Sequence, residues 1–388
     1  MNNHEILVVM HHSINNHPKA NPLGRGSYTV DEFIEHLRYF QNAGYEMISV
    51  KELMQRACEE NINKSRIAVL TFDDGFLDNY LIVPKILRQF KATGTIFVNP
   101  SHATNAPART LDEYPNAWGF LNFEEMRELE RQRILDVQSH TMTHDFSFIS
   151  DQLVDFYTPQ KFSRYYWLIW KLCPVTKTEW HGDVYRFADQ IPTGYPIFQW
   201  GRCMQGREFI PSKDFIDFSI KNFLIEGHSC ITRLELIPDK GIYESDENYQ
   251  ARIKYQLFES KSVLERELSK NIDTVCFPGD VYNENTLSCA ASAGYKVYMR
   301  HPREAGGDNL TAVLSASNNA LHDGLTGLQR LGVFSEFPKI LPRKTMAYWA
   351  TKVAVRGFIG DPFYSRFLAV GRSIMQIVRS LLLKFETR

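Results

Sequence analysis

A repeated order of one β-like run followed by one helical pattern restricts the fold of this chain more than any other feature of its sequence. The expected strands are residues 5–12, 45–50, 66–72, 94–100, 134–140, 273–279 and 295–300. Helical patterns lie between them, at residues 29–44, 51–60, 81–94, 122–133, 249–269 and 283–294. We expect Thr29 to cap the first of these helices and Gly44 to end it. Strands that alternate with helices form a parallel sheet, either open or closed into a barrel. We therefore expect an α/β fold, and in a barrel of this kind catalytic groups collect at the carboxyl ends of the strands.

Residues 146–245 interrupt this order. They are rich in aromatic side chains, as in RYYWLIWKLCP and TGYPIFQWGR, and contain many loop signals. We interpret them as one insertion that separates the first part of the barrel, residues 1–145, from its remainder, residues 246–340. Residues 341–388 form a helical tail that is more basic than the rest. The aromatic residues could wall a glycan cleft, but such a density is more typical of the core of a subdomain.

The composition argues against some classes of protein. Of 388 residues, 44% are apolar and 23% are charged, which is typical of a soluble globular protein. The formal net charge is −1, so nothing global indicates a nucleic acid partner. The six cysteines have no CxxC spacing, which favours reduced thiols in the cytosol over a disulfide framework. The first residues show neither a signal peptide nor a membrane span, so we expect a cytoplasmic protein, at most at the inner face of the membrane.

Polar side chains that can do chemistry follow several of the expected strands. Because the carboxyl ends of parallel strands meet at one rim, we expect these side chains to lie near one another. They are His11 and His12 after LVVM, Asp73 and Asp74 after VLTF, His140 and His144 in SHTMTH, and Pro278, Gly279 and Asp280 in FPGDVYN. The set contains the imidazoles and carboxylates that bind divalent ions.

His140 and His144 stand four residues apart just beyond a strand. If this segment forms a helical loop, both imidazoles face one side and can share a metal ion. With one carboxylate of the Asp73–Asp74 pair they make a three-ligand site with open positions, as in catalytic divalent sites. The ion would also relieve the repulsion between the two adjacent acids. Each motif alone has a plainer explanation, because HxxxH occurs among surface and core histidines and Asp-Asp-Gly forms ordinary turns.

The motifs TFDDG, SHTMTH and CFPGDVYN, in this order, resemble those of the polysaccharide deacetylase family, the NodB-type carbohydrate esterases. The opening LVVMHHSI and the stretch from Tyr28 to Leu53 are similar to the branch that de-N-acetylates poly-N-acetylglucosamine. The resemblance covers residues 5–145 and 246–300. It implies an irregular (β/α) barrel of the polysaccharide deacetylase type. It also implies hydrolysis of an N-acetyl, sometimes an O-acetyl, group on a sugar.

The resemblance further implies how the rim residues divide the work. Asp73 would be the general base, and Asp74, His140 and His144 would hold the metal. The implied cofactor is one divalent ion, Zn²⁺ in the first place, with Ni²⁺, Co²⁺ or Fe²⁺ as alternatives. Water activated by the ion would attack the acetyl carbonyl while Asp73 takes its proton. The ion and a backbone N–H would stabilise the oxyanion.

Two further roles follow from the same resemblance. By analogy the backbone N–H belongs to Gly279, directly after Pro278. A general acid must protonate the leaving amine, and the similar branch supplies it from the first strand, where His12 stands. His322, in NNALHDGL, is the alternative. His11 stands where the branch usually has tyrosine, so we expect it to pack or hydrogen-bond behind the site.

The third motif departs from the family pattern. Gly279 stands where an aromatic residue often follows the proline, and the arginine that commonly precedes this motif to orient the base is absent. Arg330, in LQRLGV, is a candidate to contact the substrate or Asp73, because this stretch resembles the late strand of the branch. A surface arginine at the start of a strand is the competing interpretation.

The leading hypothesis is a metal-dependent hydrolase that removes an N-acetyl group from an acetamido sugar in a glycan, a lipid-linked or a nucleotide-linked saccharide. The same chemistry on a non-sugar amide and a glycan-binding relic of a deacetylase are the alternatives. The expected partner is the acetylated amino sugar and no nucleic acid. The tail either contacts a membrane as a basic amphipathic helix or docks on the barrel. Its basic residues include Arg366, Arg372, Arg379 and Lys384.

Overall fold

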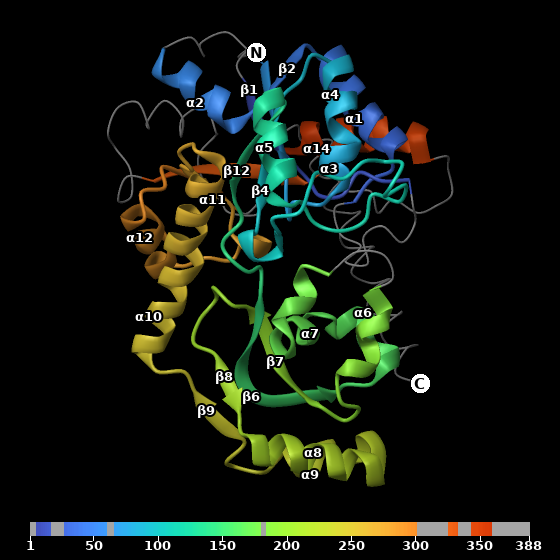
Figure 1. Ribbon diagram of the computed structural model, residues 1–388, viewed down its shortest axis with the longest axis vertical. Helices are drawn as coiled ribbons and strands as arrows, with labels where there is room; N and C mark the ends of the chain where they lie inside the picture. Colours follow the sequence, from blue (N-terminus) through green and yellow to red (C-terminus); the bar gives the residue numbers. More distant parts are fainter. Residues whose placement is uncertain are drawn as a thin grey trace.

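The computed structural model describes residues 5–16, 27–59, 66–179, 184–300, 325–332 and 343–358. A barrel and its helices form one part of the molecule, and the insertion forms a second part beyond one end of the barrel (Figure 1). Among the helices of the described ranges, none is long and apolar enough to cross a membrane.

The barrel is a closed ring of parallel strands, which confirms the expected fold class. Its order is β1, β12, β11, β10, β5, β4, β3, and β3 pairs back with β1. β2 lies outside the ring and pairs with the first half of β3. The strands are β1 (Glu5–His11), β2 (Tyr45–Ile48), β3 (Arg66–Phe72), β4 (Gly94–Val98), β5 (Leu135–Ser139), β10 (Thr274–Val275), β11 (Val297–Arg300) and β12 (Thr326–Gly332).

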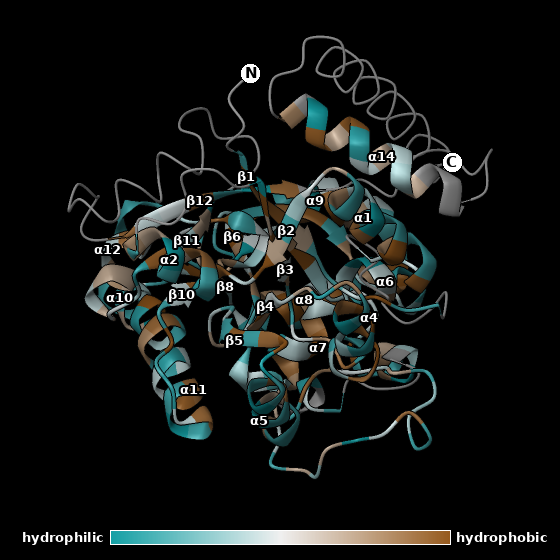
Figure 2. Cartoon of the chain, turned by 90° about the horizontal axis from the view of Figure 1, so that it is seen from above, coloured by the Kyte–Doolittle hydropathy of each residue, from teal (hydrophilic) through white to brown (hydrophobic). Residues whose placement is uncertain are grey.

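Helices surround this ring (Figure 2), and their buried apolar residues share the hydrophobic cores with the strands. They are α1 (Val30–Asn42), α2 (Val50–Cys58), α3 (Asp78–Leu81), α4 (Val83–Gln89), α5 (Phe123–Gln132), α10 (Asp246–Lys254), α11 (Ser260–Leu268), α12 (Glu284–Ser292) and α14 (Arg343–Phe358). The predicted cap at Thr29 is confirmed, because Thr29 and Glu32 form a capping box at the start of α1. α14 packs on α1, where the rings of Tyr39 and Tyr348 lie 5.5 Å apart.

The expected helix 249–269 is interrupted. α10 begins three residues earlier, after the capping residue Ser245, and a π-helical turn, η6 (Tyr255–Glu259), joins it to α11. The expected strand 273–279 is also shorter, since β10 ends at Val275 and a 3₁₀ turn, η7 (Pro278–Asp280), follows. Both departures place irregular backbone beside the carboxyl ends of β5 and β10, where π-turns and bulges often serve function.

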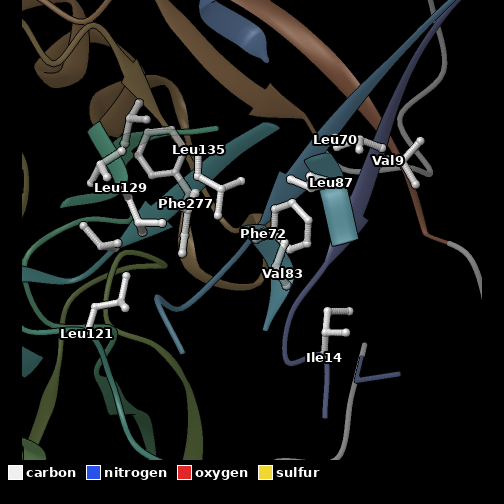
Figure 3. Packing of buried hydrophobic residues seen from close by; sticks show 14 of the residues in the cluster. Val9, Ile14, Leu70, Phe72, Val83, Leu87, Leu121, Leu129, Leu135 and Phe277 are labelled. Atoms are coloured by element: carbon white, nitrogen blue, oxygen red, sulfur yellow. The ribbon is translucent and has the colours of Figure 1, made fainter. Parts of the chain in front are cut away.

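Hydrophobic packing fixes the strand ends that carry the polar motifs. Figure 3 shows Phe72, the residue before Asp73, beside Val83, and Phe277, the residue before Pro278, beside Leu135. Both aromatic side chains are fully buried. Because these anchors are part of the close-packed core, the residues that follow them are held in place.

The insertion folds around a second core, which also includes Phe76 and Phe120 of the barrel part. Its elements are β6 (Phe146–Phe156), η2 (Pro159–Lys161), α6 (Phe162–Tyr165), α7 (Trp167–Leu172), η3 (Pro174–Lys177), η4 (Val184–Gln190), β7 (Pro196–Arg202), β8 (Phe209–Pro211), α8 (Lys213–Glu226), η5 (Gly227–Cys230), α9 (Ile231–Glu235) and β9 (Gly241–Tyr243). β6 pairs with β7 and β8 with β9, both antiparallel. Trp167 and Trp170 are buried in this second core, which favours the core interpretation of the aromatic run over a glycan wall.

Replacement of Trp167 by alanine should destabilise the protein by about 3–5 kcal/mol, because the indole is 1% exposed and packs against Phe148 and Trp200. The matched control is Leu236→Ala in the same insertion, where the side chain is 80% exposed and the expected change is within about 0.5 kcal/mol. Urea unfolding followed by circular dichroism measures both. Equal, small effects of the two substitutions would show that Trp167 is not a core residue.

Candidate active site

Backbone hydrogen bonds join the carboxyl ends of neighbouring strands into one rim. The N–H of Asp73 donates to the carbonyl of His11, at 2.9 Å, and the N–H of His140 donates to that of Val98, at 2.8 Å. The N–H of Cys276 donates to the carbonyl of Ser139, at 2.9 Å. The ends of β1, β3, β4, β5 and β10 therefore lie side by side, and all of the sequence motifs come to the same place.

The backbone of this rim adopts left-handed conformations that place its side chains. Asp74 has a φ of 72°, Thr141 of 65°, His144 of 54° and Asp280 of 55°. These are four of the eight non-glycine residues with positive φ in the described ranges, and such residues cost about 1–3 kcal/mol each and concentrate at functional sites. Residues 140–144 therefore do not form the helical loop that was the condition in the sequence argument for a shared metal ion. An irregular loop, with positive φ at two positions, brings the two imidazoles together instead.

Asp74, His140 and His144 converge on one point. Asp74 Oδ1 lies 3.2 Å from His140 Nε2 and 3.0 Å from His144 Nε2. All three side chains are buried. Two ligands of a tetrahedral ion, each about 2.0–2.1 Å from it, lie about 3.3 Å apart, so these distances have the size that a metal site requires.

The hydrogen bonds of these residues test whether an ion fits. The Nδ1 of His140 lies 2.7 Å from the carbonyl oxygen of Cys276, which can only accept, so Nδ1 carries the hydrogen and Nε2 turns its lone pair toward Asp74. Asp74 Oδ1 is buried and has no hydrogen-bond partner among the described residues. Two buried atoms that face each other at 3.2 Å, an imidazole nitrogen and a carboxylate oxygen, are satisfied by a proton or by a metal cation between them. The residues present therefore fit a divalent ion.

The protonation states also suit a metal. Burial raises the pKa of the Asp74 carboxyl, but the two histidines outweigh this effect and hold the pKa well below its usual range. For His144, burial and the guanidinium of Arg202 lower the pKa to about 4. An ionised carboxylate and neutral imidazoles are the forms in which these side chains bind metal ions.

Asp73 has a different environment from that of its neighbour. Arg330 Nη1 donates to both carboxylate oxygens of Asp73, at 2.8 and 2.6 Å, and its Nη2 donates to Asp280. Burial raises the pKa of Asp73, but Arg330 and two histidines outweigh it, so the pKa lies below its usual value. Arg330 is 1% exposed, so it is neither a surface arginine nor a direct contact for substrate. Of the two contacts expected for Arg330, the structure has the one with Asp73.

A second set of possible ligand atoms, on Asp73, His140 and Cys276, lies nearby. This set is the poorer metal site, because Asp73 is already paired with Arg330. Burial also raises the pKa of the Cys276 thiol well above its usual value, and its Sγ lies 3.8 Å from a carboxylate oxygen of Asp73 as a weak donor. Metal binding by cysteine requires the thiolate. The Asp74 set therefore remains the candidate metal site.

Two amide side chains that the sequence did not single out hold the loop of residues 140–144. Gln256, in the π-turn, receives the N–H of Thr143 at 3.0 Å, donates to its hydroxyl at 2.7 Å, and receives the N–H of Met142 on its backbone carbonyl. Asn99, after β4, donates to the carbonyls of His140 and Thr141. Neither residue belongs to a recognisable motif. The one sequence signal for Asn99 is its position at the carboxyl end of an expected strand, where active-site residues collect.

The first strand contributes His12 to the rim. Its Nε2 lies 4.0 Å from Asp73 Oδ2, and its side chain is 19% exposed. The buried carboxyl of Asp78 accepts a hydrogen bond from Ser13 and so fixes the segment directly after His12. Burial raises the pKa of Asp78 to about 7. His11 points the other way, as expected, and stacks on Phe72 with ring centroids 5.2 Å apart.

Pro278 and Gly279 form the turn after β10. Gly279 has a φ of 66° and is exposed, whereas Pro278 is buried. Asp280 is the last residue of this turn, and Arg330, which donates to both Asp280 and Asp73, links the turn to Asp73. His322 and the basic residues of the tail after residue 358 lie outside the described residues, so the choice between His12 and His322 and the role of the tail stay predictions.

Comparison with known proteins finds one family that part of this chain resembles. Residues 60–165 match the model of a family described as "Polysaccharide deacetylase". This part of the chain is therefore similar to the polysaccharide deacetylase family. The matched range contains Asp73, Asp74, His140 and His144.

Individual relatives of this deacetylase family are distant. The Bacillus subtilis protein YxkH, provisionally named a polysaccharide deacetylase, is 25% identical over 140 residues, which are 36% of this chain and 43% of that protein. A solved de-N-acetylase from Aggregatibacter actinomycetemcomitans is 14% identical with a TM-score of 0.51, over 86% of this chain and 96% of that one. The Streptococcus pyogenes deacetylase PplD, solved with acetate, is 17% identical with a TM-score of 0.46, over 88% and 96%. The Aggregatibacter structure shows that the fold is shared.

Replacement of Arg330 by methionine should destabilise the protein by about 3–5 kcal/mol near neutral pH, because two carboxylates lose their buried partner. In the wild type, Asp73 has a lowered pKa, so its contribution is present above the unfolded pKa and lost as pH falls through the folded one. Without Arg330, burial raises that pKa, and protonation then relieves the buried charge.

The deficit of the Arg330→Met protein should therefore shrink as pH falls toward about 4, as measured by urea unfolding at several pH values. Arg131→Met is the matched control, since Arg131 pairs with Glu124 on the exposed surface of α5 and its loss should matter little. A deficit that is independent of pH would contradict the assigned pairing.

Proposed function

We propose that this chain is a metal-dependent hydrolase that removes an N-acetyl group from an acetamido sugar. The proposal depends on one observation, which is that the adjacent acids Asp73 and Asp74 have different partners and different environments. Asp74 shares a metal-sized site with two histidines, and Asp73, directly beside it, is held ionised by Arg330. The similarity of residues 60–165 to the polysaccharide deacetylase family supports the reaction.

Asp74, His140 and His144 are the residues that would hold the ion. A divalent ion there supplies Lewis acidity, which polarises the acetyl carbonyl and lowers the pKa of water. Three protein ligands leave positions open, as catalytic sites require, and two imidazoles with one carboxylate suit Zn²⁺ first. Ni²⁺, Co²⁺ and Fe²⁺ accept the same ligands.

Asp73 is the proposed general base. Its carboxylate is ionised at neutral pH and accepts a proton from the attacking water. Arg330 fixes the orientation of this carboxylate through two hydrogen bonds, and its charge stabilises the ionised form. Arg330 thus acts through Asp73 and positions it.

His12 is the proposed general acid, and it protonates the leaving amine nitrogen. Its Nε2 lies 4.0 Å from Asp73 Oδ2, so one substrate amide placed against both groups can reach each of them. The N–H of Gly279, in the exposed turn after Pro278, is the proposed donor to the oxyanion. The C–N bond of the amide breaks, and acetate and a free amino sugar leave.

Asp73→Asn should keep the divalent ion and lose acetate release by at least about a hundredfold, because asparagine cannot accept the proton. Metal content by mass spectrometry and acetate release from a panel of neutral, phosphorylated and lipid-linked N-acetylhexosamines measure both properties. Asp74→Asn is the paired variant and should lose the ion as well, since it removes a ligand charge.

An Asp73→Asn protein that still releases acetate would overturn the assignment of the base. A wild-type protein that binds no divalent ion would indicate a glycan-binding relic instead of an enzyme. The reference variant is Lys213→Gln on α8, where the side chain is 86% exposed. It should fold, bind the ion and release acetate like the wild type.

A further inference from the structure

The motif that holds the two acids of the candidate site contains a third acid. In TFDDGFLDNY, Asp78 follows Asp74 by four residues and begins the short helix α3. Its side chain is 1% exposed, and the roles proposed above for Asp73 and Asp74 leave it without a task. A carboxyl group that is removed from water costs free energy unless hydrogen bonds compensate it. That compensation comes from the segment directly after β1.

Three consecutive residues of this segment act on the carboxyl group of Asp78. The hydroxyl of Ser13 donates to Asp78 Oδ2, and both side chains are buried. Burial raises the pKa of Asp78 to about 7, against hydrogen bonds from Ser13, the backbone of Ile14 and the side chain of Asn15, which lower it. The carboxyl group therefore holds a segment that lies far away in the sequence, since 65 residues separate Ser13 from Asp78.

His12, the proposed general acid, stands directly before this segment, and no hydrogen bond among the described residues fixes its ring. Its Nδ1 is buried without a partner in the part of the chain that the structure describes. Its Nε2 lies 4.0 Å from Asp73 Oδ2, which is beyond the usual length of a hydrogen bond. β1 ends one residue earlier, at His11. The position of the imidazole therefore depends on the backbone, which β1 holds before His12 and Asp78 holds after it.

A second set of hydrogen bonds holds the same segment on its other side. The N–H of Tyr28 donates to the carbonyl of Ser13, at 3.0 Å, and the N–H of Asn15 donates to the carbonyl of Tyr28, at 2.9 Å. These two bonds fix the segment against the chain before α1 but not against β3. The hydrogen bond of Ser13 to Asp78 supplies that link. It thereby sets the position of the proposed acid relative to the proposed base.

We propose that Asp78 is a positioning residue, whose carboxyl group holds the segment after His12 and so places the imidazole against the amide nitrogen that it protonates. This proposal rests on the proposed function, because Asp78 acts through the general acid. The three acids of the motif then differ in their tasks: Asp73 accepts a proton, Asp74 is a candidate metal ligand, and Asp78 positions the acid. A misplacement of about 1 Å can slow a reaction by about a hundredfold, so this hold matters for the rate.

The need for a general acid depends on the leaving group, which gives a specific test. The amine of an amino sugar must be protonated as it leaves, whereas para-nitrophenolate leaves from its acetate ester without a proton. A displaced His12 should therefore slow acetate release from an N-acetylhexosamine much more than from para-nitrophenyl acetate. The ratio of the two kcat/KM values reports the position of the acid and cancels losses that both reactions share.

In Asp78→Ala and Ser13→Ala, this ratio should fall about tenfold to a hundredfold, in the same direction as in His12→Ala. Ser13→Ala removes one hydroxyl and keeps the buried carboxyl group, so it tests the proposal even if Asp78→Ala does not fold. The double variant of Asp78→Ala with His12→Ala should have the ratio of His12→Ala alone, because Asp78 acts only through His12. Losses that multiply would overturn the proposal.

The matched control is Asp155→Ala in the insertion. Asp155 is also a buried carboxylate, 7% exposed, and accepts a hydrogen bond from the hydroxyl of Tyr165 at 2.7 Å. Its replacement should leave the ratio within about twofold of the wild type, even where it lowers stability. An equal fall of the ratio in Asp155→Ala, or an unchanged ratio in both Asp78→Ala and Ser13→Ala, would give Asp78 a merely structural role and overturn the proposal.

A readout without turnover separates this inference from the proposed function. Nuclear magnetic resonance of protein with isotope-labelled histidine rings reports each imidazole, and the signal of His12 is the one that disappears in His12→Ala. With Zn²⁺ added, this signal should shift or broaden in Asp78→Ala and Ser13→Ala and stay in place in the control. If it moves in both variants but the wild type releases acetate from no substrate, the positioning stands and the hydrolase proposal fails. If it stays in place in both, the positioning fails whatever the reaction is.

Discussion

One guanidinium buried between two carboxylates makes the candidate site possible. Arg330 reaches from β12 to Asp73 at the end of β3 and to Asp280 in the turn after β10. Two adjacent acids in the core repel each other and lose the solvation of water, so neither could stay ionised alone. Arg330 supplies the charge that Asp73 needs, and the site shared with two histidines supplies a place for a cation beside Asp74. The same interaction ties three separate segments of the barrel together at the rim.

The backbone conformations that place the side chains of the rim reduce the stability of the fold. Left-handed backbone at Asp74, Thr141 and His144 costs free energy, and the supporting network offsets it. Gln256 and Asn99 bind the backbone of the histidine loop from two sides, and the strand-end hydrogen bonds hold its first residue. Second-shell partners of this kind fix ligand orientation, so a metal site built from a loop can still be rigid. The insertion contributes Arg202, which lies over the ring of Phe146 and contacts His144.

The β-then-α order, the cap at Thr29 and the three motifs at strand ends could all be predicted, because each depends on local patterns or on residues close in sequence. The burial of Trp167 could also be predicted, because the density of aromatic residues in the insertion favours a core. The irregular form of the loop at His140–His144 could not be predicted, because its positive φ values have no clear signature in the residue types. The π-turn at Gln256 was missed for a similar reason, since its sequence has ordinary helical periodicity.

The sequence by itself determined which chemistry this chain can hold: two carboxylates in TFDDG, two imidazoles in SHTMTH and a parallel barrel whose strand ends bring them to one rim. Only the tertiary structure decided how the two acids differ. Arg330 lies 257 residues from Asp73, and Arg202 lies 58 residues from His144 in a separate ribbon. Barrel closure and the docking of the insertion place these arginines, and the charge on each acid depends on such distant contacts. Spacing along the chain cannot encode that, because electrostatic pairing depends on distance in space.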